Sequence, residues 1–256
     1  MKAPLLTGLT AATALTGIFA TSGIANADTL AQIQSAVYQP TGNELNVPPP
    51  LNSQGFGRTA IANSPLTIQQ FNSNLGTLTA ITIGFSGDMA GDGRFESTDS
   101  GASTVTAQFL GNLNLKLPDN TSLFNLNPSS NVLSFNVSAF DGSIDFGGTS
   151  GATFQGLTAA ASGQNTYTNS NFLQQFIGSG ALNFLFSATG QSVFTGPSNL
   201  FAGINTYAKA NITVTYTYEV PDQPETQVPE PAVTVGLGLV AGLGLLSQKK
   251  KTLNKI

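Results

Sequence analysis

Runs in which apolar and polar residues alternate recur through the middle of this chain. The clearest run covers residues 211–220, and its apolar positions are Ile212, Val214, Tyr216, Tyr218 and Val220. Because neighbouring side chains of a strand point to opposite faces, a period of two predicts a strand with one buried face. The same period predicts two further strands, at residues 112–117 and 133–138.

Clusters of β-branched and large apolar residues predict other strands at 30–38, 66–68 and 78–83. Glycines punctuate residues 84–93, which predicts a loop. The dipeptide Asp141-Gly142 is of a kind favoured in tight hairpin turns, and alternation resumes after it at Ile144 and Phe146. We therefore expect a hairpin centred on that dipeptide.

One internal segment has helical spacing, and its apolar positions are Phe172, Leu173, Phe176 and Ile177. Asn169 or Ser170 is suited to cap its start, and Gly178 to end it. Many short strands with a single short helix predict an all-β fold, a β-sandwich or jelly roll over residues 66–220. Residues 28–65 are expected to form an irregular lead-in, and residues 221–227 a proline-rich acidic linker.

Charged residues make up only 9% of the 256 residues, against about 25% in an average soluble protein. Residues 28–231 hold four basic and thirteen acidic residues, a formal charge of −9. This balance argues against binding to nucleic acid or anionic lipid, since both require Lys and Arg. The chain has no Cys and no His, which excludes disulfides, the usual zinc sites, a thiol nucleophile and a Ser-His-Asp relay.

The N-terminal segment has the three parts of a secretory signal peptide. Lys2 gives a positive start, residues 5–19 are mostly apolar, and Ala25 and Ala27 are small residues at the −3 and −1 positions before Asp28. We expect signal peptidase to cleave after Ala27, so that the mature protein is exported.

The C-terminal segment also has three parts. It begins with Val228, Pro229, Glu230 and Pro231, where two prolines favour an extended backbone. Residues 232–246 follow as an apolar run, and Lys249, Lys250 and Lys251 come next. As a helix the fifteen-residue run is about 22 Å long, shorter than the roughly 30 Å hydrocarbon core, although lysine side chains can reach out to the interface. An apolar run followed directly by lysines predicts a single transmembrane segment, with the lysines after it on the cytoplasmic side.

This tripartite tail, over residues 228–256, resembles the PEP-CTERM sorting signal of Gram-negative bacteria. Lysines where arginine is commoner and a short extension after residue 251 are its two departures. The resemblance implies processing by an exosortase, a precursor tethered to the inner membrane, and association with extracellular polysaccharide and biofilm. The alternative is a plain tail anchor preceded by unrelated prolines.

Four stretches of the body carry a second resemblance. They are QFNSNLGTLTAITIGFSG at 70–87, DFGGTSG at 145–151, FIGSGALNF at 176–184 and ANITVTYTYEVP at 210–221. Together they resemble the choice-of-anchor E domain, an exported bacterial domain joined to differing sorting signals. The resemblance implies a surface domain and brings no catalytic residues.

Acidic residues gather in the segment SGDMAGDGRFESTD, and they are Asp88, Asp92, Glu96 and Asp99. Carboxylates on a flexible loop can bind Ca²⁺, but the spacing differs from that of known calcium loops, and acid-rich turns are the alternative. Asp141 and Asp145 form a second pair with the same alternative. No cofactor other than Ca²⁺ is suggested.

Paired carboxylates also serve in glycoside hydrolysis, where aromatic side chains commonly stack on the sugar. The chain has no Trp and only five Tyr, and Tyr216 and Tyr218 are expected to face the core. No nucleotide-binding or nucleophile-elbow motif is present. We therefore expect an exported, non-enzymatic surface or matrix protein, structural or adhesive in exopolysaccharide or biofilm. The alternative is a calcium- or carbohydrate-binding surface module.

Overall fold

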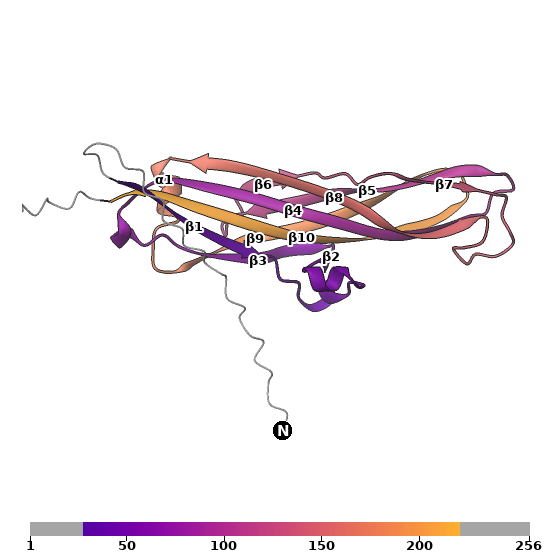
Figure 1. Ribbon diagram of the computed structural model, residues 1–256, viewed down its shortest axis with the longest axis horizontal. Coiled ribbons are helices and arrows are strands. Elements are labelled where there is room, and N and C mark those ends of the chain that lie inside the picture. Colours follow the sequence, from indigo (N-terminus) through magenta and orange to yellow (C-terminus); the bar gives the residue numbers. More distant parts are fainter. Residues whose placement is uncertain (1–27, 221–256) are drawn as a thin grey trace, which may run out of the picture. The chain divides into compact units, whose positions relative to one another are not determined.

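The computed structural model describes residues 28–220, which form two antiparallel β-sheets packed face to face (Figure 1). The all-β sandwich expected from the alternating pattern is therefore confirmed. The predicted signal peptide with Ala25 and Ala27, the linker at 221–227, and the sorting segment with Val228–Pro231 and Lys249–Lys251 lie outside the described residues.

Each sheet has five strands. The first, sheet A, has the order β1 (Thr29–Val37), β10 (Leu200–Glu219), β4 (Thr77–Ser97) and β8 (Gly151–Tyr167), with β2 (Gly57–Arg58) also paired to β10. The second, sheet B, has the order β3 (Ile61–Gln69), β9 (Ala181–Thr195), β5 (Ser103–Lys116) and β6 (Ser122–Leu126), with β7 (Leu133–Val137) also paired to β5.

The strand pairs are nested along the sequence. The strand β1 pairs with β10, β3 with β9, β4 with β8, and β5 with β6, and all four pairs are antiparallel. Successive pairs alternate between the two sheets. A long hairpin rolled up in this way is the winding of a jelly roll.

One continuous apolar core lies between the sheets. The strand β10 shows how the alternation builds it, because Ile212, Val214 and Tyr216 are each 0% exposed while the threonines between them face outward. Tyr218 is also buried, so both tyrosines belong to the core as predicted. The hydroxyl of Tyr216 satisfies its hydrogen-bonding capacity by donating to the carbonyl oxygen of Gln69 at 2.8 Å.

The predicted helix is present as α1 (Ser170–Gln174). The side chain of Asn169 caps it by accepting hydrogen bonds from the backbone N–H groups of Asn171 and Phe172. The helix ends before Gly178, which had been expected to stop it. Three short 3-10 helices, at Gly42–Leu45, Leu51–Gln54 and Ser73–Leu75, complete the helical structure of residues 28–220.

The loop predicted at residues 84–93 is wrong, because these residues lie within the 21-residue strand β4. Two of their glycines, Gly87 and Gly91, face the opposite sheet, where space is short. A Cβ on Gly87 would lie 2.7 Å from Leu113 Cδ1, and one on Gly91 would lie 3.0 Å from Phe109 Cδ1. Glycine here allows the two sheets to pack closely. A glycine inside a strand can mark such a close approach as well as a bulge or a bend.

The hairpin predicted at Asp141-Gly142 is also wrong. Residues 138–150 form an irregular loop between β7 and β8, in which Ile144 is 53% exposed. Asp141 accepts from the backbone N–H of Ser143 at 3.0 Å, and Asp145 accepts from that of Gly147 at 2.9 Å. These side chains therefore shape local turns, which is the alternative noted for this acidic pair.

Residues before position 66 take part in the sandwich. The strand β1 pairs with β10 over nine residues, and β3 begins at Ile61. The segment between them covers the outer face of sheet A, where Val47 and Phe56 pack on Ala90 and Tyr207. The segment expected to be an irregular lead-in therefore contains the strand β1, the start of β3 and a covering segment between them. The sandwich begins at Thr29.

The two ends of the described chain meet at one end of the sandwich. The backbone N–H of Val220 donates to the carbonyl oxygen of Asp28 at 3.1 Å, one step beyond the Thr29–Glu219 pair. In Figure 1 the start of β1 and the end of β10 lie together on the left. Residues 28 and 220 therefore lie at the same end of the sandwich.

Candidate functional site

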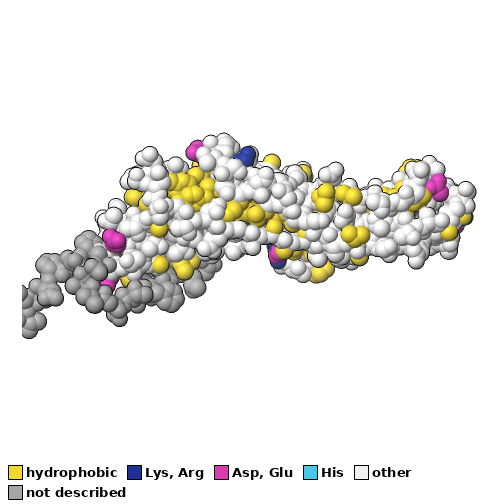
Figure 2. Space-filling model, turned by 90° about the horizontal axis from the view of Figure 1, so that it is seen from above, with side chains coloured by type: hydrophobic (Ala, Val, Ile, Leu, Met, Phe, Trp, Pro, Cys, Tyr) yellow, Lys and Arg dark blue, Asp and Glu magenta, His cyan; other side chains and the backbone are white. Residues whose placement is uncertain are grey.

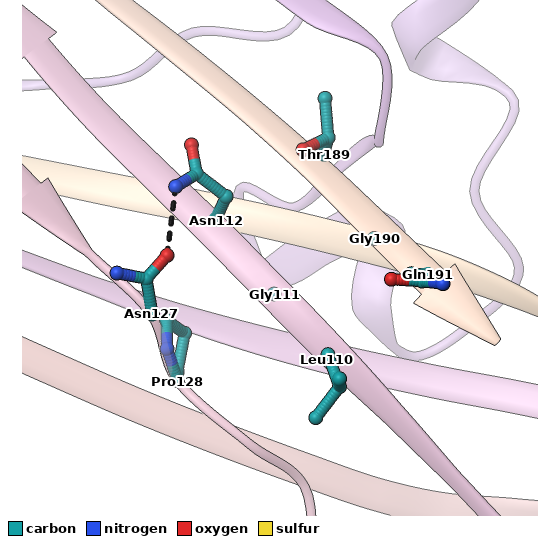
Figure 3. A pocket seen from close by; sticks show the side chains of 8 residues that line it. All are labelled: Leu110, Gly111, Asn112, Asn127, Pro128, Thr189, Gly190 and Gln191. Atoms are coloured by element: carbon teal, nitrogen blue, oxygen red, sulfur yellow. Dashed lines mark hydrogen bonds between the residues drawn. The ribbon is translucent and has the colours of Figure 1, made fainter. Parts of the chain in front are cut away.

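A shallow groove of about 370 Å³ crosses the outer face of sheet B (Figure 3). It lies over β5 and β9 and is bordered by the segment that follows β6. Its lining residues are Leu110, Gly111, Asn112, Asn127, Pro128, Thr189, Gly190 and Gln191. None of these side chains is charged, so the groove is suited to a neutral ligand.

Glycines form the floor of the groove because the sheets are close at this point. Gly111 and Gly190 are paired across β5 and β9. A Cβ on Gly111 would lie 2.3 Å from Met89 Sδ, and one on Gly190 would lie 2.2 Å from Thr206 Oγ1. The backbone N–H of Gly111 donates to the carbonyl oxygen of Pro128 at 2.7 Å, which holds the border segment against β5.

Amides supply the polar groups of the groove. Asn112 Nδ2 donates to Asn127 Oδ1 at 2.8 Å and also to Asn125 Oδ1. Within residues 28–220, Asn112 Oδ1 and Asn127 Nδ2 make no hydrogen bond, and both are visible in Figure 3. Thr189 and Gln191 are exposed beside them. The groove thus presents donors and acceptors next to the apolar side chain of Leu110, as a sugar or another polyhydroxylated molecule requires.

The four acidic residues weighed as calcium ligands do not form a cluster. Asp88, Asp92 and Glu96 lie on β4 four residues apart, so they share a face but their Cα atoms are separated by steps of about 13 Å. Asp99 lies just beyond the strand. Among the residues that the structure describes, no three acidic side chains converge as a metal site would need.

Asp88 and Asp99 each have a partner on the chain's last third. Asp88 forms an ion pair with Lys209 at 3.2 Å, and the ammonium group of Lys209 also lies 4.9 Å from the centre of the Phe56 ring. Asp99 accepts from Asn199 Nδ2 at 2.6 Å. Both pairs join β4 or its end to β10 or the turn before it, which is a structural role.

Asp92 belongs to a polar group on the outer face of sheet A. It accepts from Asn205 Nδ2 at 3.3 Å, and Asn205 Oδ1 accepts from Arg58 at 3.4 Å. Tyr207 lies in the same place, and its pKa is raised, first by burial and then by the neighbouring Asp92 carboxylate, with Arg58 opposing weakly. This group ties the covering segment to sheet A.

Glu96 is the most buried of the four, at 0% exposed. Its Oε1 accepts from the Ser150 hydroxyl at 2.6 Å, and its Oε2 accepts from the backbone N–H of Phe146 at 2.8 Å. The Arg94 guanidinium lies 4.2 Å from the centre of the Phe146 ring. Glu96 therefore holds the loop at 138–150 in place, a role that could not be predicted from the sequence.

Addition of millimolar Ca²⁺ is expected to leave the melting temperature of the protein unchanged. A ligand that binds only the folded state raises the melting temperature, and the dispersed carboxylates offer no site for it. Differential scanning calorimetry with Mg²⁺ at equal ionic strength as the control checks this. A rise specific to Ca²⁺ would contradict the expectation.

Three tyrosines have pKa values above the usual value of about 10. Burial is the main cause at Tyr38, Tyr207 and Tyr216, and the carboxylate of Glu44, which accepts from Tyr38 at 2.9 Å, adds to the effect. In the folded state these phenols stay neutral while those of the unfolded chain ionise. These three tyrosines should therefore leave the free energy of unfolding unchanged below pH 10 and lower it as the pH rises above 10.

An alkaline titration followed by phenolate absorbance checks this pH dependence. The absorbance of Tyr38, Tyr207 and Tyr216 should appear only together with loss of the native circular dichroism signal. In denaturant, all five tyrosines of the chain should titrate together near pH 10. Reversible ionisation of Tyr38, Tyr207 and Tyr216 in the folded protein would contradict the expectation.

The groove was not anticipated from the sequence, since only Asn112 lay in a predicted strand.

Residues 28–220 contain no helix with the length and apolar character needed to cross a bilayer. The predicted transmembrane segment at 232–246 lies outside the described residues.

No family model and no curated protein matches this chain. Similar solved structures include dimeric latent PorU from Porphyromonas gingivalis, at 10% identity and a TM-score of 0.26, over 86% of this chain and 15% of that chain. The structure of infectious bursal disease virus Gt strain is 10% identical with a TM-score of 0.12, over 89% and 53%. The VP2 subviral particle of that virus is 11% identical with a TM-score of 0.14, over 93% and 55%. The chain thus spans less than two thirds of each, and TM-scores this low do not establish a common fold.

Proposed function

We propose that this chain is a non-enzymatic exported protein that an exosortase sorts through its C-terminal segment to the cell surface or extracellular matrix. The observation that carries the proposal is the order of the tail, in which Pro229-Glu230-Pro231 precedes an apolar run and three lysines. Signal peptidase acts first, at Ala27, and the membrane holds the precursor through residues 232–246 until processing. The body then serves a structural or adhesive role in polysaccharide.

The surface of the sandwich supports a matrix role. Threonine and asparagine side chains bond to one another across neighbouring strands of sheet B, as in the pairs Thr67–Asn183, Thr104–Asn136 and Thr106–Thr195. Figure 2, which looks down on the uppermost side of Figure 1, shows charged side chains only at scattered points. A surface made mostly of hydroxyls and amides, with few charged groups, suits contact with hydrated polysaccharide.

The intact mass of the protein recovered from the surface and medium of a host that carries an exosortase tests the sorting proposal. The mass should lack residues 1–27 and the residues after about Pro231. Joint replacement Pro229→Ala and Glu230→Ala should leave the chain in the inner membrane, whereas Pro224→Ala in the linker should not. A wild-type mass ending at Ile256 would reduce the tail to a plain anchor.

A second candidate, a carbohydrate-binding surface module, is favoured by the groove on sheet B. Its unpaired amide groups and uncharged lining suit a neutral glycan. Isothermal titration calorimetry with neutral oligosaccharides should show binding. Asn127→Ala and Gln191→Ala should each raise the dissociation constant severalfold. Asn165→Ala, at an exposed asparagine on β8, is the control. Binding unaffected by either groove substitution would dismiss this candidate.

A further inference from the structure

The two sheets leave four strand edges, and the fold blunts three of them. At β1, the Gln34 side chain accepts from the backbone N–H of Gln69 on β3 and so joins two edges. The strand β3 contains Pro65 and a register shift near Asn63. At the remaining edge of sheet B, β6 and β7 have only five residues each. Short strands, proline and bulges are the usual protection against edge-to-edge pairing.

The edge formed by β8 has little such protection. It has 17 residues, and beyond the register shift near Gly156 its pairing with β4 is regular from Leu157 to Tyr167. This stretch reads LTAAASGQNTY and contains neither a charged residue nor a proline. In Figure 1 the strand lies along the upper side of the sandwich. A long, uncharged, regular edge is a template for another strand.

The register identifies which backbone groups face outward. Thr158 exchanges hydrogen bonds with Asn131 on the side away from β4, through its N–H at 2.9 Å and its carbonyl oxygen at 3.3 Å. In an antiparallel ladder every second residue has this orientation. The outward groups therefore belong to Ala160, Ser162, Gln164 and Thr166, all with exposed side chains. No hydrogen bond to these backbone groups is found within residues 28–220.

We propose that β8 is a self-association edge, at which two copies of the chain pair antiparallel about a twofold axis at Ser162. This register places Ala160 opposite Gln164 of the second copy, and Ser162 opposite Ser162 of the second copy. All of these residues have outward N–H and carbonyl groups, so each facing pair can exchange two hydrogen bonds. The two A sheets then become one continuous sheet.

A second copy fits this edge because the edge is self-complementary. A twofold axis brings identical residues close together, which a charged residue near the axis would oppose. The stretch has no charge, and the nearest carboxylate, Asp88 opposite Ala160 on β4, already pairs with Lys209. The axis therefore meets only hydroxyl, methyl and amide side chains.

The absence of cysteine from the chain gives a direct test in the full-length protein. In the proposed register, Ser162→Cys places two thiols on facing residues with Cα atoms about 5.5 Å apart, within the range of a disulfide. Thr166→Cys is the matched control on the same strand, because its two copies are about 26 Å apart in this register. Mild oxidation should cross-link Ser162→Cys many times more than Thr166→Cys.

Charged pairs test the register without a change in the number of charges. In the Ser162→Cys background, adding Ala160→Lys with Gln164→Glu makes opposite charges face each other, so cross-linking should persist. Adding Ala160→Lys with Gln164→Lys makes like charges face each other, so cross-linking should be lost. Circular dichroism checks that each variant folds. We expect all of them to fold, because the substituted positions are exposed.

Three results would overturn the proposal. The first is equal cross-linking of Ser162→Cys and Thr166→Cys, which indicates random collision. The second is a folded Ser162→Cys protein that does not cross-link, as occurs if another segment of the chain covers the edge. The third is equal cross-linking of the two charged variants. None of these results bears on sorting, which residues 228–256 control.

Discussion

Replacement of Phe186 by alanine is expected to lower the free energy of unfolding by about 3–5 kcal/mol. Phe186 on β9 is 0% exposed and lies between the sheets. Its ring centre is 5.2 Å from that of Tyr38 and 6.1 Å from that of Phe85. The substitution removes the contacts of β9 with these two rings across the core and leaves a cavity that a strand paired on both sides cannot close.

Equilibrium unfolding in urea measures this loss. The matched control is Phe201→Ala on β10, since Phe201 is 53% exposed and its replacement should cost under about 1 kcal/mol. The midpoint should shift at an unchanged slope, because the surface exposed on unfolding is nearly the same. Equal losses at the two phenylalanines would show that Phe186 does not join the sheets.

The second large effect is expected at Glu96. Glu96→Ala leaves the Ser150 hydroxyl and the Phe146 N–H without their buried acceptor, which should cost about 2–4 kcal/mol. Glu96→Gln keeps one acceptor oxygen and should cost less. Because the carboxylate holds the loop at 138–150, limited proteolysis within that loop should speed up along with the loss of stability.

Glu219→Ala is the control for Glu96, since Glu219 is an exposed glutamate at the end of β10. Its replacement should change the free energy of unfolding by no more than about 0.5 kcal/mol. Should Glu96→Ala be as mild as Glu219→Ala, the loop would have to be held by its own turns and not by the carboxylate.

The alternation of apolar and polar residues predicted strands that have one face in the core and the other toward solvent. It placed strands correctly in β5, β7 and β10, while clusters of β-branched and large apolar residues located β1, β3 and the first part of β4, and helical spacing located α1 with its Asn169 cap. The prediction failed at 84–93, because glycines that allow two sheets to approach look in sequence like glycines of a loop. The strand β8 was not predicted at all, because its alanine, serine and glycine residues give no contrast between the two faces.

The candidate site was harder to anticipate for a different reason. The acidic residues are close in sequence, but an extended strand separates residues four apart by about 13 Å, so proximity along the chain did not become proximity in space. The groove has the opposite property. Asn112, Asn127 and Gln191 come from three segments that only the pairing of β5 with β9 and with the segment after β6 brings together.

The meeting of Asp28 and Val220 at one end of the sandwich has a mechanical consequence. A pull on residue 220 against the far end of β4 runs along β10, which is bonded to β1 on one side and over nearly its whole length to β4 on the other. Ladder bonds perpendicular to that pull must break together. A pull between residues 28 and 220 opens the β1–β10 ladder one pair at a time. Single-molecule extension should therefore require a larger force in the first geometry, so the sandwich should resist a pull between residue 220 and its opposite end better than a pull between residues 28 and 220.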